Sequence, residues 1–211
     1  MKIEVKKLTK KFRNINVIDN VNITFKSGKI YGITGRNGSG KTVFLKMLCS
    51  FYIPTSGTIL QDGINYIENN SFPNNTRALI DGPDFIPDLT GFENLKLISS
   101  ILNIINDDDI NNILELIGLG KYKTKKYSEY SMGMKQKLGI AQVLMENPRF
   151  IILDEPFNGI DDKSVENIKK ILLEEKKKDK LIIITSHIKE DIIELCDEVY
   201  RFDNGVLSKN E

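Results

Sequence analysis

The stretch GRNGSGKT, from Gly35 to Thr42, has the composition of a phosphate-binding turn. It follows the apolar run KIYGIT and precedes TVFLKML, so it joins an expected strand to an expected helix. Glycine lets the backbone approach an anion closely, and the N–H groups at a helix start can donate to phosphate oxygens. A glycine-rich turn without a ligand is the alternative, and the strand and helix on either side favour phosphate. The candidate phosphate contacts are Gly35, Asn37, Gly38, Ser39, Gly40, Lys41 and Thr42.

Two residues of this turn have distinct expected roles. Lys41 would reach the β and γ phosphates of a nucleotide. Thr42 would hold Mg²⁺ through its hydroxyl oxygen. The turn therefore predicts a nucleotide and a divalent cation together.

A pair of carboxylates, Asp154 and Glu155, ends the apolar run in FIILDEP. We expect Asp154 at the carboxyl edge of a buried strand, where open α/β sheets bind ligands. There Asp154 would orient Mg²⁺, while Glu155 would point elsewhere and could polarise an attacking water. Alone, such a pair is most often solvated, but beside a phosphate-binding turn it is the expected metal half of one site.

The stretch EYSMGMKQKLGIAQ delivers Ser131 and Gly133 to the start of an expected long helix. Small residues at a helix N-terminus expose N–H donors and the positive end of the helix dipole, which suits an anion. The alternative is that Ser131 is an ordinary N-cap of a core helix.

The elements that must position these residues follow from the hydrophobic pattern. Expected strands lie near Ile3–Leu8, Val17–Phe25, Ile30–Thr34, Thr58–Leu60, Phe150–Leu153, Leu181–Thr185 and Glu198–Phe202. Expected helices lie near Val43–Cys49, Phe92–Ile104, Asp108–Ile117, Gly133–Glu146, Lys163–Lys177 and Lys189–Leu195. From about residue 76 helices run without strands until Phe150. This order predicts an α/β core interrupted by a helical subdomain at residues 76–135.

Composition limits the function classes. The chain has 211 residues and 40% hydrophobic content, which suits one domain, with or without an inserted subdomain. Its 30 basic and 29 acidic residues are mixed along the sequence, so no footprint for nucleic acid is expected. The apolar runs are too short for a signal peptide or a membrane span, and we expect a cytoplasmic protein. Cys49 and Cys196 fit reduced thiols.

Together these stretches resemble the nucleotide-binding cassette of ABC ATPases over nearly the whole chain. The resemblance implies a single domain, residues 1–211, with an α/β fold. Its parts would be a P-loop NTPase core with a mostly parallel sheet, an N-terminal antiparallel β subdomain and the inserted helical subdomain. It also implies ATP and Mg²⁺ as ligands and hydrolysis of ATP to ADP and phosphate.

The resemblance assigns roles to further residues. Phe12 stands where an aromatic residue stacks on adenine, and His187, in TSH, stands where a histidine contacts the γ-phosphate. With Glu155, His187 would be catalytic. Ser131 and Gly133 correspond to the signature loop, which caps ATP bound by a second cassette in a head-to-tail dimer. The loop NGID, residues 158–161, corresponds to a dimer contact.

Two departures from the family pattern matter. Met132 and Met134 replace the usual glycine and glutamine of the signature loop. Asp81 occupies the position of a hinge glutamine that links Mg²⁺ and the attacking water to the membrane partner. A carboxylate accepts from metal-bound water but cannot donate, so we expect Asp81 to be a metal ligand that positions water poorly.

The resemblance also implies partners. We expect a second cassette, identical or different, and a multi-helix transmembrane permease that holds the chain at the cytoplasmic face of the membrane. Acidic hinge residues followed by LTGFENL look similar to exporters of drugs and antimicrobial peptides and to self-immunity cassettes. The alternatives are a soluble ABC-type ATPase in cofactor assembly or cell-division control, and ATP binding without hydrolysis. Repair ATPases and translation factors need a long coiled coil or two cassettes, which this sequence lacks.

Overall fold

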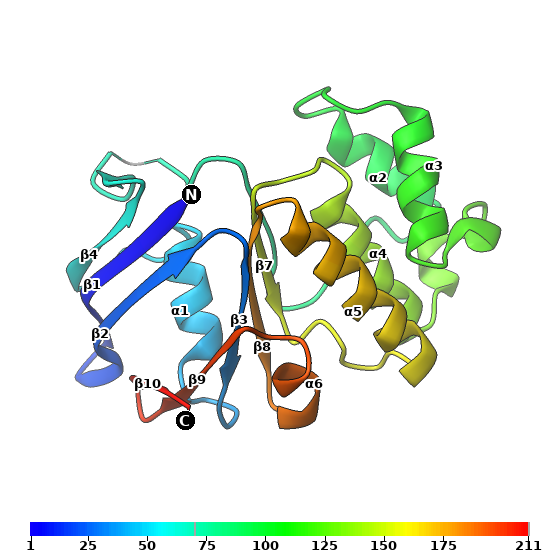
Figure 1. Ribbon diagram of the computed structural model, residues 1–211. Helices are drawn as coiled ribbons and strands as arrows, with labels where there is room; N and C mark the ends of the chain where they lie inside the picture. Colours follow the sequence, from blue (N-terminus) through cyan, green and yellow to red (C-terminus); the bar gives the residue numbers. More distant parts are fainter. Residues whose placement is uncertain (70, 211) are drawn as a thin grey trace.

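The structure is a computed structural model that describes residues 1–69 and 71–210. Its strands form two sheets (Figure 1). The strands are β1 (Lys2–Phe12), β2 (Ile15–Lys26), β3 (Lys29–Thr34), β4 (Ser56–Gln61), β5 (Ile64–Asn65), β6 (Thr76–Leu79), β7 (Phe150–Asp154), β8 (Leu181–Ser186), β9 (Glu198–Asp203) and β10 (Val206–Lys209). The helices are α1 (Lys41–Leu48), α2 (Gly91–Ser99), α3 (Asp107–Leu116), α4 (Met132–Leu144), α5 (Asp162–Lys177) and α6 (Lys189–Ile193), with short 3-10 helices η1 (Gly120–Tyr122) and η2 (Tyr127–Glu129).

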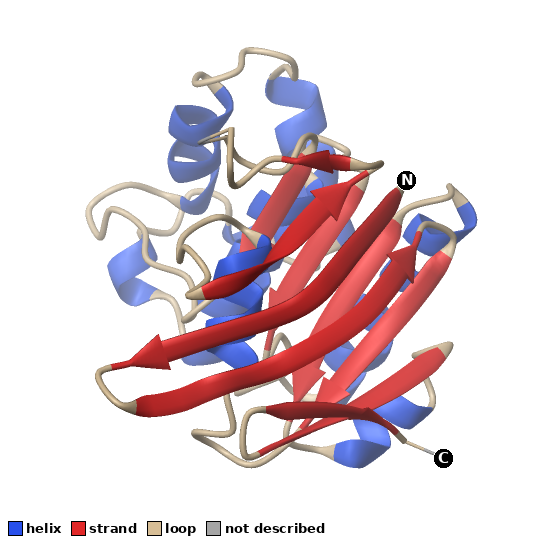
Figure 2. Cartoon of the chain, turned by 90° about the vertical axis from the view of Figure 1, so that its left-hand side faces the viewer, coloured by secondary structure: helices blue, strands red, loops and turns tan. Residues whose placement is uncertain are grey.

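The first sheet is antiparallel and has the strand order β2-β1-β4-β5. Its two long strands, β1 and β2, run side by side as a hairpin (Figure 2). Buried and exposed residues alternate along the second half of β2, because one face of the hairpin packs on the core and the other meets solvent. This sheet confirms the expected N-terminal antiparallel subdomain.

The second sheet has the order β10-β9-β3-β8-β7-β6, and every pair in it except β9 and β10 is parallel. All residues of β7 and β8 are buried, as in parallel strands covered by packed elements on both faces. The order places the carboxyl ends of β3, β8 and β7 side by side at one edge. The phosphate-binding turn and the carboxylate pair therefore meet at this edge.

Helix α1 lies between the two sheets (Figure 1). Its Phe44 packs against Phe25 of β2 and Phe202 of β9, with ring centroids 6.4 and 5.5 Å apart. A separate cluster of buried residues connects helices α2, α3, α4 and α5 with strands β6, β7 and β8. These helices lie on the side away from the antiparallel sheet (Figure 1). The buried apolar residues of α1 belong to the other cluster, which also contains residues of β1, β2 and β3.

Residues 76–79, the first four of the predicted helical subdomain, form β6 and pair with β7. The helices begin only after this strand, and α2 and α3 lie far from the antiparallel sheet (Figure 1). That these helices act as a separate subdomain within a single domain stays a prediction. Within the described ranges, no helix is both long and apolar enough to cross a membrane.

Candidate active site

The phosphate-binding turn connects β3 to α1 in a path that glycine alone can follow. A Cβ on Gly35 would lie 2.5 Å from the carbonyl oxygen of Phe202. At Gly40 the φ angle is 111°, and a Cβ would lie 2.8 Å from the carbonyl oxygen of Val17. Both positions therefore require glycine, because one side of the turn packs directly against β2 and β9. A ligand can approach the turn only from the opposite side.

Lys41 is buried, and its ammonium curls back over the turn. Its Nζ donates to the carbonyl oxygens of Gly35 at 2.8 Å and Arg36 at 3.3 Å. The same nitrogen lies 3.7 Å from Oε1 of Glu155. A phosphate entering the turn would meet this positive charge at the centre of the loop.

Asp154 ends β7 and accepts hydrogen bonds from two hydroxyls. Thr42 Oγ1, in the first turn of α1, donates to Oδ2 at 2.7 Å. Thr185 Oγ1, near the end of β8, donates to Oδ1. Hydroxyl and carboxylate oxygens are the ligands that Mg²⁺ prefers, so Thr42 and Asp154 form a fitting half-site.

Thr185 is a site residue that the sequence reasoning missed. It closes the apolar run LIIIT, one strand away from Asp154, and it also accepts from the backbone N–H of Glu155 at 3.0 Å. The available signal was a buried polar residue at the carboxyl end of a predicted parallel strand. That Thr185 lies beside Asp154 follows from the order of the strands in the sheet, which the sequence alone does not give.

Glu155 has a φ of 50°, in the left-handed region that glutamate rarely adopts. The turn points its side chain away from that of Asp154 and toward His187. Its Oε2 accepts from His187 Nδ1 at 2.8 Å and from the backbone N–H of His187 at 3.2 Å. Gln136 of α4 fixes the backbone from the other side by donating to the carbonyl oxygen of Glu155 at 3.2 Å.

Two buried side-chain oxygens within the described residues have no hydrogen-bond partner, Ser39 Oγ and Glu155 Oε1. Ser39 belongs to the phosphate-binding turn. Glu155 lines a cavity of about 310 Å³ together with Lys41 and Thr42. Spare acceptors beside a lysine and a cradle of N–H groups fit a nucleotide phosphate with its metal and a water molecule.

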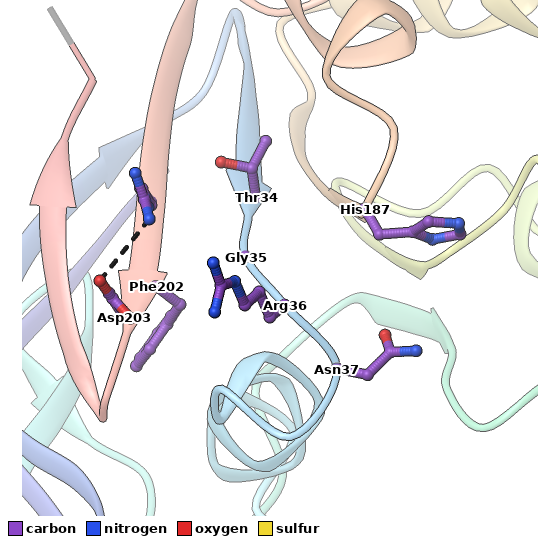
Figure 3. Close-up of a pocket in the computed structure, with 8 residues that line it drawn as sticks. Thr34, Gly35, Arg36, Asn37, His187, Phe202 and Asp203 are labelled. Carbon is purple, nitrogen blue, oxygen red and sulfur yellow. Dashed lines mark ion pairs between the residues drawn. The ribbon is translucent and has the colours of Figure 1, made fainter.

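His187 follows β8 and lines a neighbouring cavity of about 480 Å³. Figure 3 shows His187 on one side of this cavity and Phe202 on the other, with Gly35 and Arg36 between them. Its side chain is about half exposed, with 47% of its surface accessible. The structure thus brings His187 to the phosphate-binding turn, as the sequence predicted.

Phe12 lies at the end of β1 and is 40% exposed. Its ring meets Tyr52 edge to face, with centroids 5.6 Å apart, and the Nζ atom of Lys10 lies 5.0 Å from its centroid. Val17, on the adjacent β2, lines the cavities beside the phosphate-binding turn. Adenine stacking on Phe12 stays a prediction.

Ser131 is the N-cap of α4, and its Oγ accepts from the backbone N–H of Met134 at 3.3 Å. Next to it, a Cβ on Gly133 would lie 2.6 Å from the carbonyl oxygen of Gly159, so α4 starts in tight contact with the loop after Glu155. Met132 is 69% exposed beside this contact. The capping role of Ser131 is therefore real, and it leaves the hydroxyl hydrogen free to donate.

Asp81 follows β6 with a φ of 62°, which aspartate tolerates better than most residues. Its carboxylate pairs with the ammonium of Lys46 on α1. This hydrogen bond raises the pKa of Lys46 above its usual value. Lys46 was not expected from the sequence, although it stands four residues after Thr42 and so shares its helix face. A metal-ligand role for Asp81 stays a prediction.

Comparison with known proteins agrees with this site. The profile of the family described as ABC transporter matches residues 18–158. The chain belongs to the ABC transporter ATP-binding family. As an ABC cassette it binds ATP and hydrolyses it to ADP and phosphate, as the subunit that powers a transporter. The match confirms the P-loop NTPase fold and the resemblance to ABC ATPases that the sequence motifs indicated.

Several curated relatives match nearly the full cassette. An uncharacterized ABC transporter ATP-binding protein, YybJ of Bacillus subtilis, is 44% identical over 99% of this chain and 96% of its own length. The bacitracin transport ATP-binding protein BcrA of Enterococcus faecalis is 38% identical over 97% of this chain and 67% of its own. The lantibiotic transport ATP-binding protein SrtF of Streptococcus pyogenes is 30% identical over 99% and 90%.

The fold has solved counterparts. A dimeric, post-hydrolysis structure of the ATP-binding cassette MJ0796, bound to ADP and phosphate, superposes with a TM-score of 0.88. The match covers 99% of this chain and 98% of that one at 22% identity. At that identity it supports the cassette fold alone.

Proposed function

We propose that this cassette drives the export of an antimicrobial peptide or a related drug, by pairing with a second cassette around ATP and Mg²⁺. The single observation that carries the catalytic part is the placement of Glu155. Its Oε2 is held by His187, while its buried Oε1 is free of hydrogen bonds and lies 3.7 Å from Lys41 Nζ. That free oxygen is the acceptor a hydrolytic water needs.

Each site residue has a defined task in this proposal. Lys41 and the backbone N–H groups of residues 35–42 bind the phosphates, and His187 contacts the γ-phosphate while it orients Glu155. Thr42 and Asp154 would hold Mg²⁺, with Asp81 nearby. The cation would neutralise charge on the phosphate oxygens. Glu155 takes the proton of the attacking water.

The second cassette completes the site in trans. Ser131 lies at the start of α4, where its hydroxyl hydrogen and the helix N–H groups can donate to a phosphate held by a partner. Gly133 keeps this turn against Gly159, so the signature loop and the following dimer loop form one contiguous surface. Two such surfaces, one on each cassette, support a head-to-tail dimer with two nucleotides between the cassettes.

The transport partner is proposed from the relatives. Bacitracin and lantibiotic transport are the roles in the names of BcrA and SrtF, and both proteins match this chain along most of its length. We infer a multi-helix permease as the partner, with the cassette at the cytoplasmic face of the membrane. Phe12, at the end of β1, is the proposed adenine platform.

Affinity capture from detergent-solubilised cells of the source organism tests this proposal. The tagged cassette should retain a multi-helix membrane protein. Deletion of the gene for the cassette should raise the sensitivity of the cells to peptide antibiotics. Lys41→Ala in the same strain should retain the membrane protein yet fail to restore resistance. Recovery of the cassette with soluble partners alone would refute the transport role, since a cofactor-assembly or cell-division ATPase would behave in that way.

A further inference from the structure

Asp81 and Lys46 join two parts of the chain that differ in function. Lys46 is on α1, the helix that begins at the phosphate-binding turn, and Asp81 is the hinge between β6 and the segment that leads to α2. The Lys46 side chain is 21% exposed, whereas that of Asp81 is 60% exposed. The lysine is therefore the fixed partner and the aspartate the one that is held.

The position of Lys46 on α1 is set by its neighbours. It lies four residues after Thr42, about 6 Å further along the same face of the helix. Its Nζ also lies 5.5 Å from the centroid of the Tyr52 ring, so the ammonium meets an aromatic face as well as a carboxylate. Two contacts of different kinds restrict this flexible side chain to one place.

The backbone of the hinge has an unusual conformation. Asp81 and Gly82 have φ angles of 62° and 84°, so two successive residues are left-handed, and the chain bends at Asp81. Pro83 follows, and its carbonyl oxygen accepts from Tyr127 OH at 3.1 Å. The hinge is thus anchored beyond residue 82, and on its other side the Asp81 carboxylate reaches α1.

We propose that Lys46 is a positioning residue that clamps the hinge to α1 and holds the Asp81 carboxylate at the helix face that Lys46 shares with Thr42. The clamp places a negative charge near the metal half-site and offsets it with a positive one. Asp81 then remains available to metal-bound water. This last part rests on the proposed function of Asp81, whereas the clamp itself does not.

A double-mutant cycle tests the clamp by hydrogen exchange of the peptide that covers residues 76–86, which includes β6, paired with β7, and the Ile86 N–H, which donates to Asn94 Oδ1 at 2.9 Å. Lys46→Met keeps the length and removes the charge, and Asp81→Asn keeps a residue that tolerates a positive φ. Each single variant should speed exchange about three- to tenfold, which corresponds to the loss of one pair with a partly buried member. The double variant should be no faster than either single variant, and Lys46→Arg should resemble wild type. Lys96→Met, which breaks the exposed pair with Asp107, is the matched control and should leave this peptide unchanged.

A second readout separates the clamp from the metal role. Lys46→Met should change the Mg²⁺ concentration that gives half-maximal phosphate release about as much as Asp81→Asn does, with a smaller change in the KM for ATP. The clamp would be overturned if hydrogen exchange in Lys46→Met were as slow as in wild type. It would also be overturned if the effects of the two substitutions on exchange added up in the double variant. If the two substitutions have non-additive effects on hydrogen exchange but every variant keeps the wild-type Mg²⁺ requirement, the clamp is supported and the metal role of Asp81 is refuted. A shift in Asp81→Asn that Lys46→Met lacks would overturn the positioning role.

Discussion

Nδ1 of His187 lies 2.8 Å from Oε2 of Glu155, while the other oxygen of that carboxylate lies 3.7 Å from Nζ of Lys41. Glu155 is therefore held between the histidine after β8 and the lysine of the phosphate-binding turn. One oxygen is held by the histidine, and the other has no hydrogen-bond partner. This arrangement links the roles that we propose for the three residues.

His187→Ala removes the ring that contacts Glu155 and that we propose contacts the γ-phosphate. We expect kcat to fall on the order of a hundredfold while ATP affinity changes little, because general base catalysis depends on the position of the carboxylate. His187→Gln, which retains a donor, should recover part of the loss. Phosphate release and calorimetric ATP binding measure the two effects, and a wild-type kcat in His187→Ala would remove the histidine from the mechanism.

Thr185→Val keeps the shape of a fully buried residue but removes its hydroxyl. Asp154 Oδ1 loses its donor, and the N–H of Glu155 keeps only the carbonyl oxygen of residue 185 of its two acceptors, so unfolding in urea should show about 1–3 kcal/mol less stability. Hydrolysis should also slow, because both carboxylate residues are positioned by this hydroxyl. Thr185→Ser is the matched control and should retain most of the stability. Equal losses in the two variants would contradict the account.

Ser131→Arg tests the site in trans. In a Glu155→Gln background, light scattering should show an ATP-dependent dimer that Ser131→Arg abolishes, because the larger side chain would meet the partner's nucleotide. Binding of ATP to the monomer should be unchanged. Ser128→Arg, at a nearby exposed serine, should leave the dimer intact. The trans assignment fails if Ser131→Arg dimerises like its parent.

The acid stability of the protein should depend on Glu198 of β9. Hydrogen bonds from Lys29 and then Lys209 lower the pKa of Glu198 from 4.5 to about 2. A carboxyl whose folded pKa is lowered stabilises the fold above its unfolded pKa and loses that contribution as pH falls. The melting temperature of Lys29→Met should therefore lie below that of wild type at pH 7, and the gap should narrow between pH 4.5 and 2. A gap that is constant over this range would assign the effect to packing.

The parts of the candidate site whose placement could be expected are local in sequence. GRNGSGKT between a strand and a helix, and two carboxylates after FIIL, carry their own structural context. Strands β3, β7 and β8 were expected within one or two residues of their observed ends, because long apolar runs define buried parallel strands.

The parts that were missed depend on contacts between distant segments. Strand β6 is only four residues long and lies between polar stretches, so its pairing with β7 gives it its structure. Helix α2 ends at Ser99, although the apolar pattern continues to Ile104. Thr185 and Lys46 are ordinary residues in sequence and acquire partners only when β8 meets β7 and α1 meets the hinge.

Single-turnover phosphate release from Glu155→Gln tests the central claim, that the free oxygen of Glu155 activates the hydrolytic water. With Mg²⁺ and saturating ATP, this variant should bind nucleotide as wild type does and release phosphate at least about a hundredfold more slowly. Glu166→Gln, at an exposed glutamate of α5, should hydrolyse ATP at the wild-type rate. A Glu155→Gln cassette that releases phosphate as fast as wild type would contradict the account.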